Sequence, residues 1–250
     1  MAVRTSPPPR QNTEGRAAIA HPPPPTPLGR GFALVAGVGL LLMAALGAFG
    51  YIGVVEGLVT DGDAGRTAAD ISGSARLFAL GVSALYAAAL LDVVVAWALL
   101  RFFEPVDSSL ARLSAYLRIA YAGVFLVAIS QLAGVPEILE RGGGAFSTEQ
   151  VQAQALTRIE SFHDVWFASL VLFGAHLAVL GLVVLSTSAP RILGVLLLVA
   201  GGGYVFDTFH ALLRPDTTMT VSSVTFLGEF LLALWLVAKA GRPGRDRAWR

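Results

Sequence analysis

Six long apolar blocks separated by short polar connections constrain this chain more than any other feature of its sequence. A helix needs about 20 residues to cross the hydrocarbon core of a bilayer, with a usual range of about 17–25. Each block is long enough, and none alternates in polarity as an outer-membrane strand does. The pattern therefore predicts an all-α integral membrane bundle of six transmembrane helices. The blocks are residues 32–54, 77–100, 114–135, 165–186, 192–213 and 221–240.

Charge and cysteine content exclude several classes of function. Charged residues make up 14% of the chain, against about 25% in a soluble domain, and they gather between the blocks. A net formal charge of +1 gives no reason to expect nucleic acid binding. The chain has no cysteine, which excludes disulfides, iron–sulfur clusters and cysteine-ligated zinc. The lipid bilayer is the partner that composition predicts, and a protein partner or small-molecule ligand stays open.

The two ends of the chain differ from the apolar region between them. Residues 1–30 are rich in proline and lack apolar periodicity, so they are predicted to be a disordered tail. The transmembrane domain is expected over residues 31–241, followed by a basic tail at 242–250.

Two connections carry helix-start patterns, Thr67 with Asp70 and Ser147 with Gln150. The second pattern predicts an amphipathic helix that runs into the fourth block.

The distribution of lysine and arginine predicts the orientation in the membrane, because cytoplasmic loops carry an excess of both. With the N-terminus inside, twelve of these residues lie in inner segments and five in outer segments. The remaining one, Arg118, lies inside the third block. The sequence thus predicts a protein of the inner (plasma) membrane with both termini in the cytoplasm.

Several short stretches, in a fixed order along the blocks, resemble a known family. They are LLDV at 90–93, FEPV at 103–106, FGAHL at 173–177, PRILGVLLLVAGGGYVFD at 190–207, GEF at 228–230 and LWL at 234–236. Together they resemble the bacterial membrane family called domain of unknown function 4386. The resemblance covers roughly residues 30–242 and keeps the order of all six blocks. It implies a multi-pass membrane protein without an assigned activity.

Ionisable residues inside the blocks are the main candidates for function, because a charge at the bilayer centre costs about 2.5–3.5 kcal/mol on insertion scales. Asp92 lies about 13 Å, and Arg118 about 9 Å, from the inner ends of adjacent antiparallel helices. Their depths predict an ion pair, which is either a structural clamp or part of a proton or ion relay. The five candidates are Asp92, Arg118, His176, Asp207 and Glu229.

His176 and Glu229 both lie near the middle of their blocks. One interpretation is a histidine–carboxylate pair that exchanges protons, since histidine titrates near physiological pH. The other is a neutral histidine that hydrogen-bonds to serine, threonine or a backbone carbonyl and holds helices together. The choice depends on whether the fourth and sixth blocks pack together.

Four residues near the predicted outer face could serve as metal ligands. His163 and Asp164 precede the fourth block, and Asp207 and His210 share a helix face at i, i+3 spacing. Two histidines and two carboxylates can bind zinc or another divalent ion. The alternative is that these side chains only meet water, since the sequence has no H-E-x-x-H motif.

Glycines mark places where helices either pack closely or break. Gly47, Gly50 and Gly53 repeat at three-residue spacing in the first block, and 201–203 are three glycines in the fifth. Glycine lets helices approach closely in lipid, and it also marks the broken helices of transporter binding sites. Close packing is the preferred interpretation.

The sequence lacks the motifs of common enzymes. There is no P-loop and no G-x-S-x-G nucleophile elbow, so no catalytic residue or cofactor is predicted. The preferred hypothesis is a non-enzymatic multi-pass membrane protein. A small-solute or proton-coupled membrane carrier is the first alternative, and a membrane-embedded metal-dependent enzyme is the second.

Overall fold

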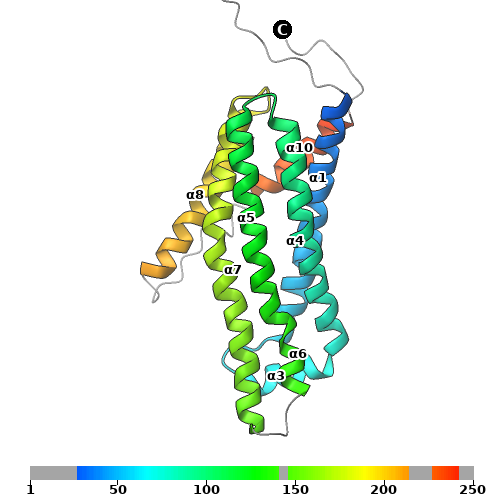
Figure 1. The fold of residues 1–250 in the computed structure, drawn as a ribbon, viewed down its shortest axis with the longest axis vertical. Helices are drawn as coiled ribbons and strands as arrows, with labels where there is room; N and C mark the ends of the chain where they lie inside the picture. Colours follow the sequence, from blue (N-terminus) through cyan, green and yellow to red (C-terminus); the bar gives the residue numbers. More distant parts are fainter. Residues whose placement is uncertain (1–26, 141–145, 214–226, 242–250) are drawn as a thin grey trace, which may run out of the picture.

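The computed structural model describes residues 27–140, 146–213 and 227–241. Every secondary-structure element in these ranges is helical, in agreement with the predicted all-α class. The long helices run side by side along one axis (Figure 1). Residues 1–26 of the tail predicted at 1–30, and the whole tail predicted at 242–250, lie outside the described residues and stay predictions. Helix α1 already begins at Pro27, because proline is well tolerated in the first turn of a helix.

The helices follow the order of the apolar blocks. Those of the described chain are α1 (Pro27–Gly47), continued by the π-helix η1 (Ala48–Val55) and α2 (Glu56–Leu58), α3 (Ala64–Gly73), α4 (Ala75–Phe103), α5 (Ser108–Ala133), α6 (Val135–Glu140), α7 (Thr148–Leu185), α8 (Arg191–Leu213) and α10 (Leu227–Ala240).

Five helical segments among the described residues are long and apolar enough to cross a membrane. Their outer surfaces carry large apolar side chains, such as Leu90 and Ile52, which are more than 60% exposed. A soluble protein rarely exposes so much apolar surface, whereas a lipid-facing surface requires it. The segments are Gly29–Leu58, Ala75–Phe103, Ser108–Glu140, Thr148–Leu185 and Arg191–His210.

The sixth predicted span is described only in part. Residues 221–226 of that block lie outside the described residues, and α10 has 14 residues. At 1.5 Å per residue α10 is about 21 Å long, shorter than the hydrocarbon core of about 30 Å. In Figure 1 it crosses obliquely behind α4 and α5 and ends beside the start of α1. Six complete spans are therefore not seen, and α10 instead reaches from the middle of the bundle to one end.

The two predicted helix starts had different outcomes. Ser147 and Gln150 form the predicted capping box, with bonds of 2.9 and 3.3 Å, and α7 runs from there through the fourth block. The start predicted at Thr67 was wrong. Asp63 caps α3 by accepting from the Arg66 amide at 2.8 Å, while Thr67 is buried and binds Thr60. Aspartate is the stronger N-cap residue, and Asp63 comes before Thr67, so its carboxylate binds a free N–H group at the helix start.

Glycines bring α7 and α8 into close contact. A Cβ at Gly174 would lie 2.6 Å from the carbonyl oxygen of Gly201, and one at Gly181 would lie 2.8 Å from that of Gly194. Helix α8 is continuous through 201–203, so the broken-helix alternative for these glycines was wrong. Gly201 serves close packing, which the sequence analysis preferred, whereas Gly202 has no neighbour within 4 Å of an added Cβ.

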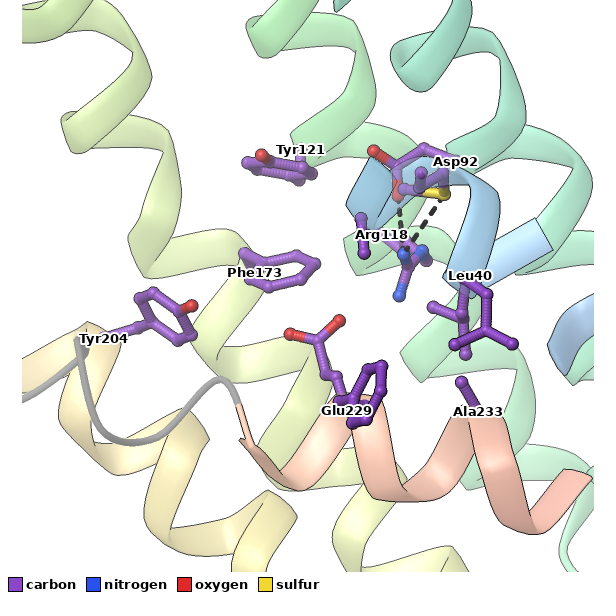
Figure 2. Close-up of a pocket in the computed structure, with 12 residues that line it drawn as sticks. Leu40, Asp92, Arg118, Tyr121, Phe173, Tyr204, Glu229 and Ala233 are labelled. Atoms are coloured by element: carbon purple, nitrogen blue, oxygen red, sulfur yellow. Dashed lines mark hydrogen bonds and ion pairs between the residues drawn. The ribbon is translucent and has the colours of Figure 1, made fainter. Parts of the chain in front are cut away.

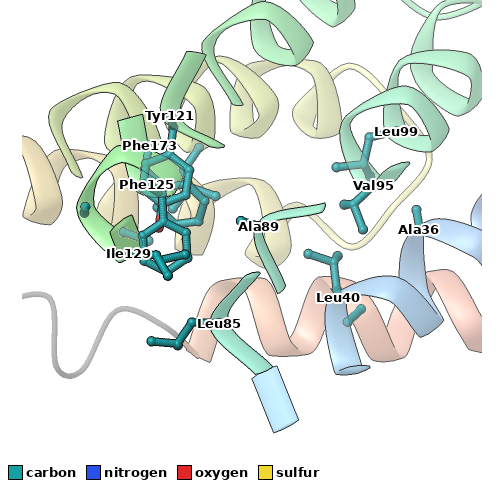
Figure 3. Packing of buried hydrophobic residues seen from close by; sticks show 14 of the residues in the cluster. Ala36, Leu40, Leu85, Ala89, Val95, Leu99, Tyr121, Phe125, Ile129 and Phe173 are labelled. Atoms are coloured by element: carbon teal, nitrogen blue, oxygen red, sulfur yellow. The ribbon is translucent and has the colours of Figure 1, made fainter. Parts of the chain in front are cut away.

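Aromatic side chains fill the core between α5 and α7. The rings of Tyr121 and Phe173 are 4.7 Å apart, and Tyr121 stacks on Phe125 at 5.8 Å (Figure 3). The indole N–H of Trp166 donates to the hydroxyl of Tyr121 at 3.1 Å. This aromatic cluster forms one wall of the polar site described next.

Candidate functional site

Two of the predicted charges meet inside the bundle. Nη2 of Arg118, on α5, lies 2.7 Å from Oδ1 of Asp92, on α4, and both side chains are at most 3% exposed. The helices are antiparallel neighbours, so similar depths place the two groups side by side, as their spacing in the sequence predicted. Burial makes each charge depend on the other, because an unpaired charge is costly in a dry interior. Whether the pair acts as a clamp or as a relay stays a prediction.

Arg118 makes further contacts that reach two more helices. Its Nη1 donates to Nε2 of His176 on α7 at 3.0 Å, and its Nη2 lies 3.9 Å from Sδ of Met43 on α1. Its guanidinium lies over the ring of Phe173, 5.4 Å from the centroid. Figure 2 shows the contact between Arg118 and Asp92 as a dashed line. Arg118 therefore links α1, α4, α5 and α7 at one point.

The contacts of His176 determine its hydrogen-bonding state. Arginine only donates, so Nε2 of His176 must accept, and the ring is neutral with its hydrogen on Nδ1. That Nδ1 lies 2.9 Å from both the carbonyl oxygen and Oγ of Ser114. Among the described residues no hydrogen bond or ion pair joins His176 to Glu229. The arrangement is the neutral, backbone-bonded histidine of the sequence analysis and not the histidine–glutamate pair.

Replacing His176 by leucine is expected to destabilise the fold by about 1–3 kcal/mol, because Nη1 of buried Arg118 would lose its acceptor. His176→Gln is the matched variant, since its amide oxygen can still accept from Arg118. Thermal unfolding in detergent measures the stability of both variants. Equal stability of wild type and His176→Leu would contradict the assigned role.

A cavity of about 190 Å³ lies beside the ion pair. This volume is far above the roughly 10–15 Å³ that one water needs and below the roughly 300–1,000 Å³ of pockets for drug-sized ligands. It therefore suits a small guest. Helices α1, α4, α5, α7, α8 and α10 all contribute to it, through Leu40, Leu41, Met43, Ala44, Asp92, Arg118, Tyr121, Phe173, Tyr204, Glu229, Phe230 and Ala233.

The charges that line the cavity are not equally accessible. Asp92 and Arg118 are 2% and 1% exposed, whereas Glu229 is only partly buried. Figure 2 shows the Glu229 carboxylate pointing from α10 into the space bounded by Arg118, Phe173 and Tyr204. Among the described residues, Glu229 is thus the charged group that a guest in the cavity meets first.

Comparison with known sequences identifies the family. The profile described as "Domain of unknown function (DUF4386)" matches residues 35–240. The chain belongs to the DUF4386 family. An uncharacterized protein of Archaeoglobus fulgidus is 32% identical over 152 residues, which is 60% of this chain and 77% of that protein. No solved structure matches. The resemblance found in the sequence is confirmed, and the polar site of this DUF4386 chain lies wholly within the matched residues.

The proposed metal ligands of the DUF4386 chain do not come together. Nε2 of His163 lies 3.6 Å from Oε1 of Glu56, and the ring of His210 stacks on Phe206. No three histidine, aspartate or glutamate side chains within the described ranges gather where they could hold a metal ion. Asp207 is also not among the residues that line the cavity. Among the described residues, the alternative of a metal-dependent enzyme therefore has no group of side chains that could bind the metal.

Sequence reasoning missed part of the site in this DUF4386 chain. Met43 and Tyr204 carry no charge, so the search for intramembrane charges passed over them. It found no candidate on α1, and its candidate on α8, Asp207, does not line the cavity. Tyr204 does lie within the stretch 190–207 that resembles the family. A search for polar aromatic residues at the depth of Asp92 and Arg118 would have found it.

Proposed function

We propose that this DUF4386 protein is a non-enzymatic carrier that binds a small solute in the central cavity and moves it across the cell membrane. The cavity is the observation that carries the proposal. A clamp between Asp92 and Arg118 requires neither an adjacent space of about 190 Å³ nor a third charge, Glu229, directed into it. Ionisable residues inside a membrane commonly mark the path of a substrate or an ion.

The position of the cavity supports a carrier. Asp92 lies eleven residues before the end of α4 and Arg118 ten residues after the start of α5. These separations are about 17 and 15 Å by helical rise, which places the cavity near mid-depth. Transporters typically hold their substrates near the bilayer midplane, at a junction of several helices. Here six helices meet at one site, and the short α10 supplies the accessible carboxylate of Glu229.

The lining supports binding in preference to catalysis. No serine, threonine, lysine or histidine is among the described residues that line the cavity. An aliphatic hydroxyl, amine or imidazole nucleophile next to a base, as many enzymes use, is therefore not among them. The membrane orientation is part of the proposal: α1 begins and α10 ends at the same end of the bundle (Figure 1), and the excess of arginine in the adjacent segments favours the cytoplasm for that end.

Thiol labelling tests the carrier directly, because the chain has no native cysteine. Ala44 and its neighbour Ala45 are both exposed, but of the two only Ala44 lines the cavity. In membrane vesicles of both orientations, Ala44→Cys is expected to react with a water-soluble, membrane-impermeant thiol reagent from either side, since a carrier opens its site alternately. Ala45→Cys is the matched control and is expected to stay unlabelled in lipid.

Two results would contradict the carrier. Absence of labelling at Ala44→Cys from both sides would mean that the cavity is closed to water. Labelling from one side only would indicate a binding protein without transport. Reaction of both variants after solubilisation and unfolding shows that each thiol is present and intact.

A further inference from the structure

We infer that the guest of the cavity is a small organic ammonium ion, held by the carboxylate of Glu229 and by aromatic faces. The inference rests on the proposed carrier function, because it names the class of solute that the same cavity takes. Three observations support it: the unbalanced charge of the groups that line the cavity, the aromatic side chains in its wall, and the contacts that already engage Nη1 and Nη2 of Arg118.

The charges that line the cavity do not balance. Asp92 and Arg118 line the cavity but neutralise each other across 2.7 Å, and both are buried. Glu229 has no hydrogen bond or ion pair with either of them among the described residues, and its carboxylate points into the space (Figure 2). One negative charge is thus left for a guest to neutralise. A buried charge is tolerated when it is paired, so a guest with one positive charge fits.

The walls suit an organic cation better than a bare metal ion. Phe173, Tyr204 and Phe230 line the cavity together with aliphatic side chains. The Tyr204 ring meets Phe173 edge to face at 5.5 Å, and Figure 2 shows Tyr204 next to Glu229. Aromatic faces attract ammonium groups, and such cages recognise quaternary ammonium ligands. A metal ion would need several oxygen ligands, and Glu229 is the one accessible carboxylate among the described lining residues.

An anionic guest would find little to bind. Nη1 and Nη2 of Arg118 already contact His176 and Asp92. Its Nε has no partner and is buried. An anion would therefore meet the repulsion of the Glu229 carboxylate while both Nη groups of Arg118 are already engaged.

Two small ions of opposite and permanent charge provide the test, tetramethylammonium and methanesulfonate. For the full chain in nanodiscs, calorimetry is expected to show binding of tetramethylammonium and not of methanesulfonate. Glu229→Gln is expected to weaken this binding by at least about tenfold, because the Coulomb attraction between the carboxylate and the cation is lost. Glu56→Gln is the matched control, since Glu56 lies near His163 and does not line the cavity.

A second measurement keeps the inference testable if Glu229→Gln fails to fold. Bound tetramethylammonium is expected to slow the labelling of Ala44→Cys in the otherwise unchanged protein, whereas methanesulfonate is expected to leave the labelling rate unchanged. Counterflow of labelled tetramethylammonium in proteoliposomes then reports transport.

The outcomes separate the ligand class from the carrier function. Tetramethylammonium that binds and shows counterflow supports both. Binding without counterflow supports the ammonium class and contradicts the carrier. If methanesulfonate binds, slows the labelling of Ala44→Cys and shows counterflow, the inference of an ammonium ligand is wrong, whereas the proposed carrier function is supported. If neither ion binds or slows the labelling of Ala44→Cys, the inference of an ammonium ligand is wrong. Labelling of Ala44→Cys from the two sides of the membrane then tests the carrier function by itself.

Discussion

Replacing Arg118 by leucine is expected to lower the free energy of unfolding by about 3–5 kcal/mol, because removal of one partner leaves a buried charge unpaired. Asp92 would face a dry interior, and His176 and Met43 would lose their contacts to the guanidinium as well. Thermal unfolding in detergent and the amount of folded protein in membranes both report the loss. Asp92→Asn is expected to act in the same direction.

The double variant distinguishes a clamp from a relay. If the ion pair is a clamp, Asp92→Asn together with Arg118→Leu folds and accumulates better than either single variant, since no unpaired charge remains. Full recovery is not expected, because His176 still lacks the donor on Arg118. Should Asp92 remain essential for function in an Arg118→Leu background, the clamp would be excluded and a relay through Asp92 favoured.

Replacing Gly201 by alanine is the second change with a large expected effect. Its new Cβ would clash with the carbonyl oxygen of Gly174 and would lie 2.7 Å from the amide nitrogen of Ala178, both on α7. Backbone atoms cannot turn aside as a flexible side chain can, so α7 and α8 would have to separate. Overpacking of this kind costs about 1–3 kcal/mol, and it would also move Tyr204, three residues along α8, away from the cavity.

Gly202→Ala is the matched control for that substitution, because no atom lies within 4 Å of a Cβ at Gly202. It is expected to be neutral or to stabilise the helix by up to about 1 kcal/mol, since alanine has the higher helix propensity. The two variants are compared by thermal unfolding and by tetramethylammonium binding. Equal stability of Gly201→Ala and Gly202→Ala would contradict the close packing of α7 on α8.

Much of the fold follows from local sequence. The lengths and hydropathy of the first five blocks predict the five segments that can cross a membrane, because lipid requires every backbone polar group to be satisfied within a helix. The capping box at Ser147 and Gln150 fixes the start of α7 in the same local way. The α3 start was missed because the sequence analysis followed the [ST]-x-x-[DE] pattern at Thr67, although aspartate is the stronger N-cap residue and Asp63 lies in the same connection.

The sequence by itself determined the all-α class, the family and the depth of Asp92, Arg118, His176 and Glu229, because each depends on hydropathy and helical rise along one chain. Only the tertiary structure decided what those side chains do. It paired His176 with Ser114 and Arg118, left the Glu229 carboxylate facing a cavity, and assembled that cavity from six helices. The rotation and tilt of each helix come from side-chain packing against its neighbours, such as the glycine contacts of α7 and α8. Such contacts join residues far apart in the chain, and no local pattern encodes them.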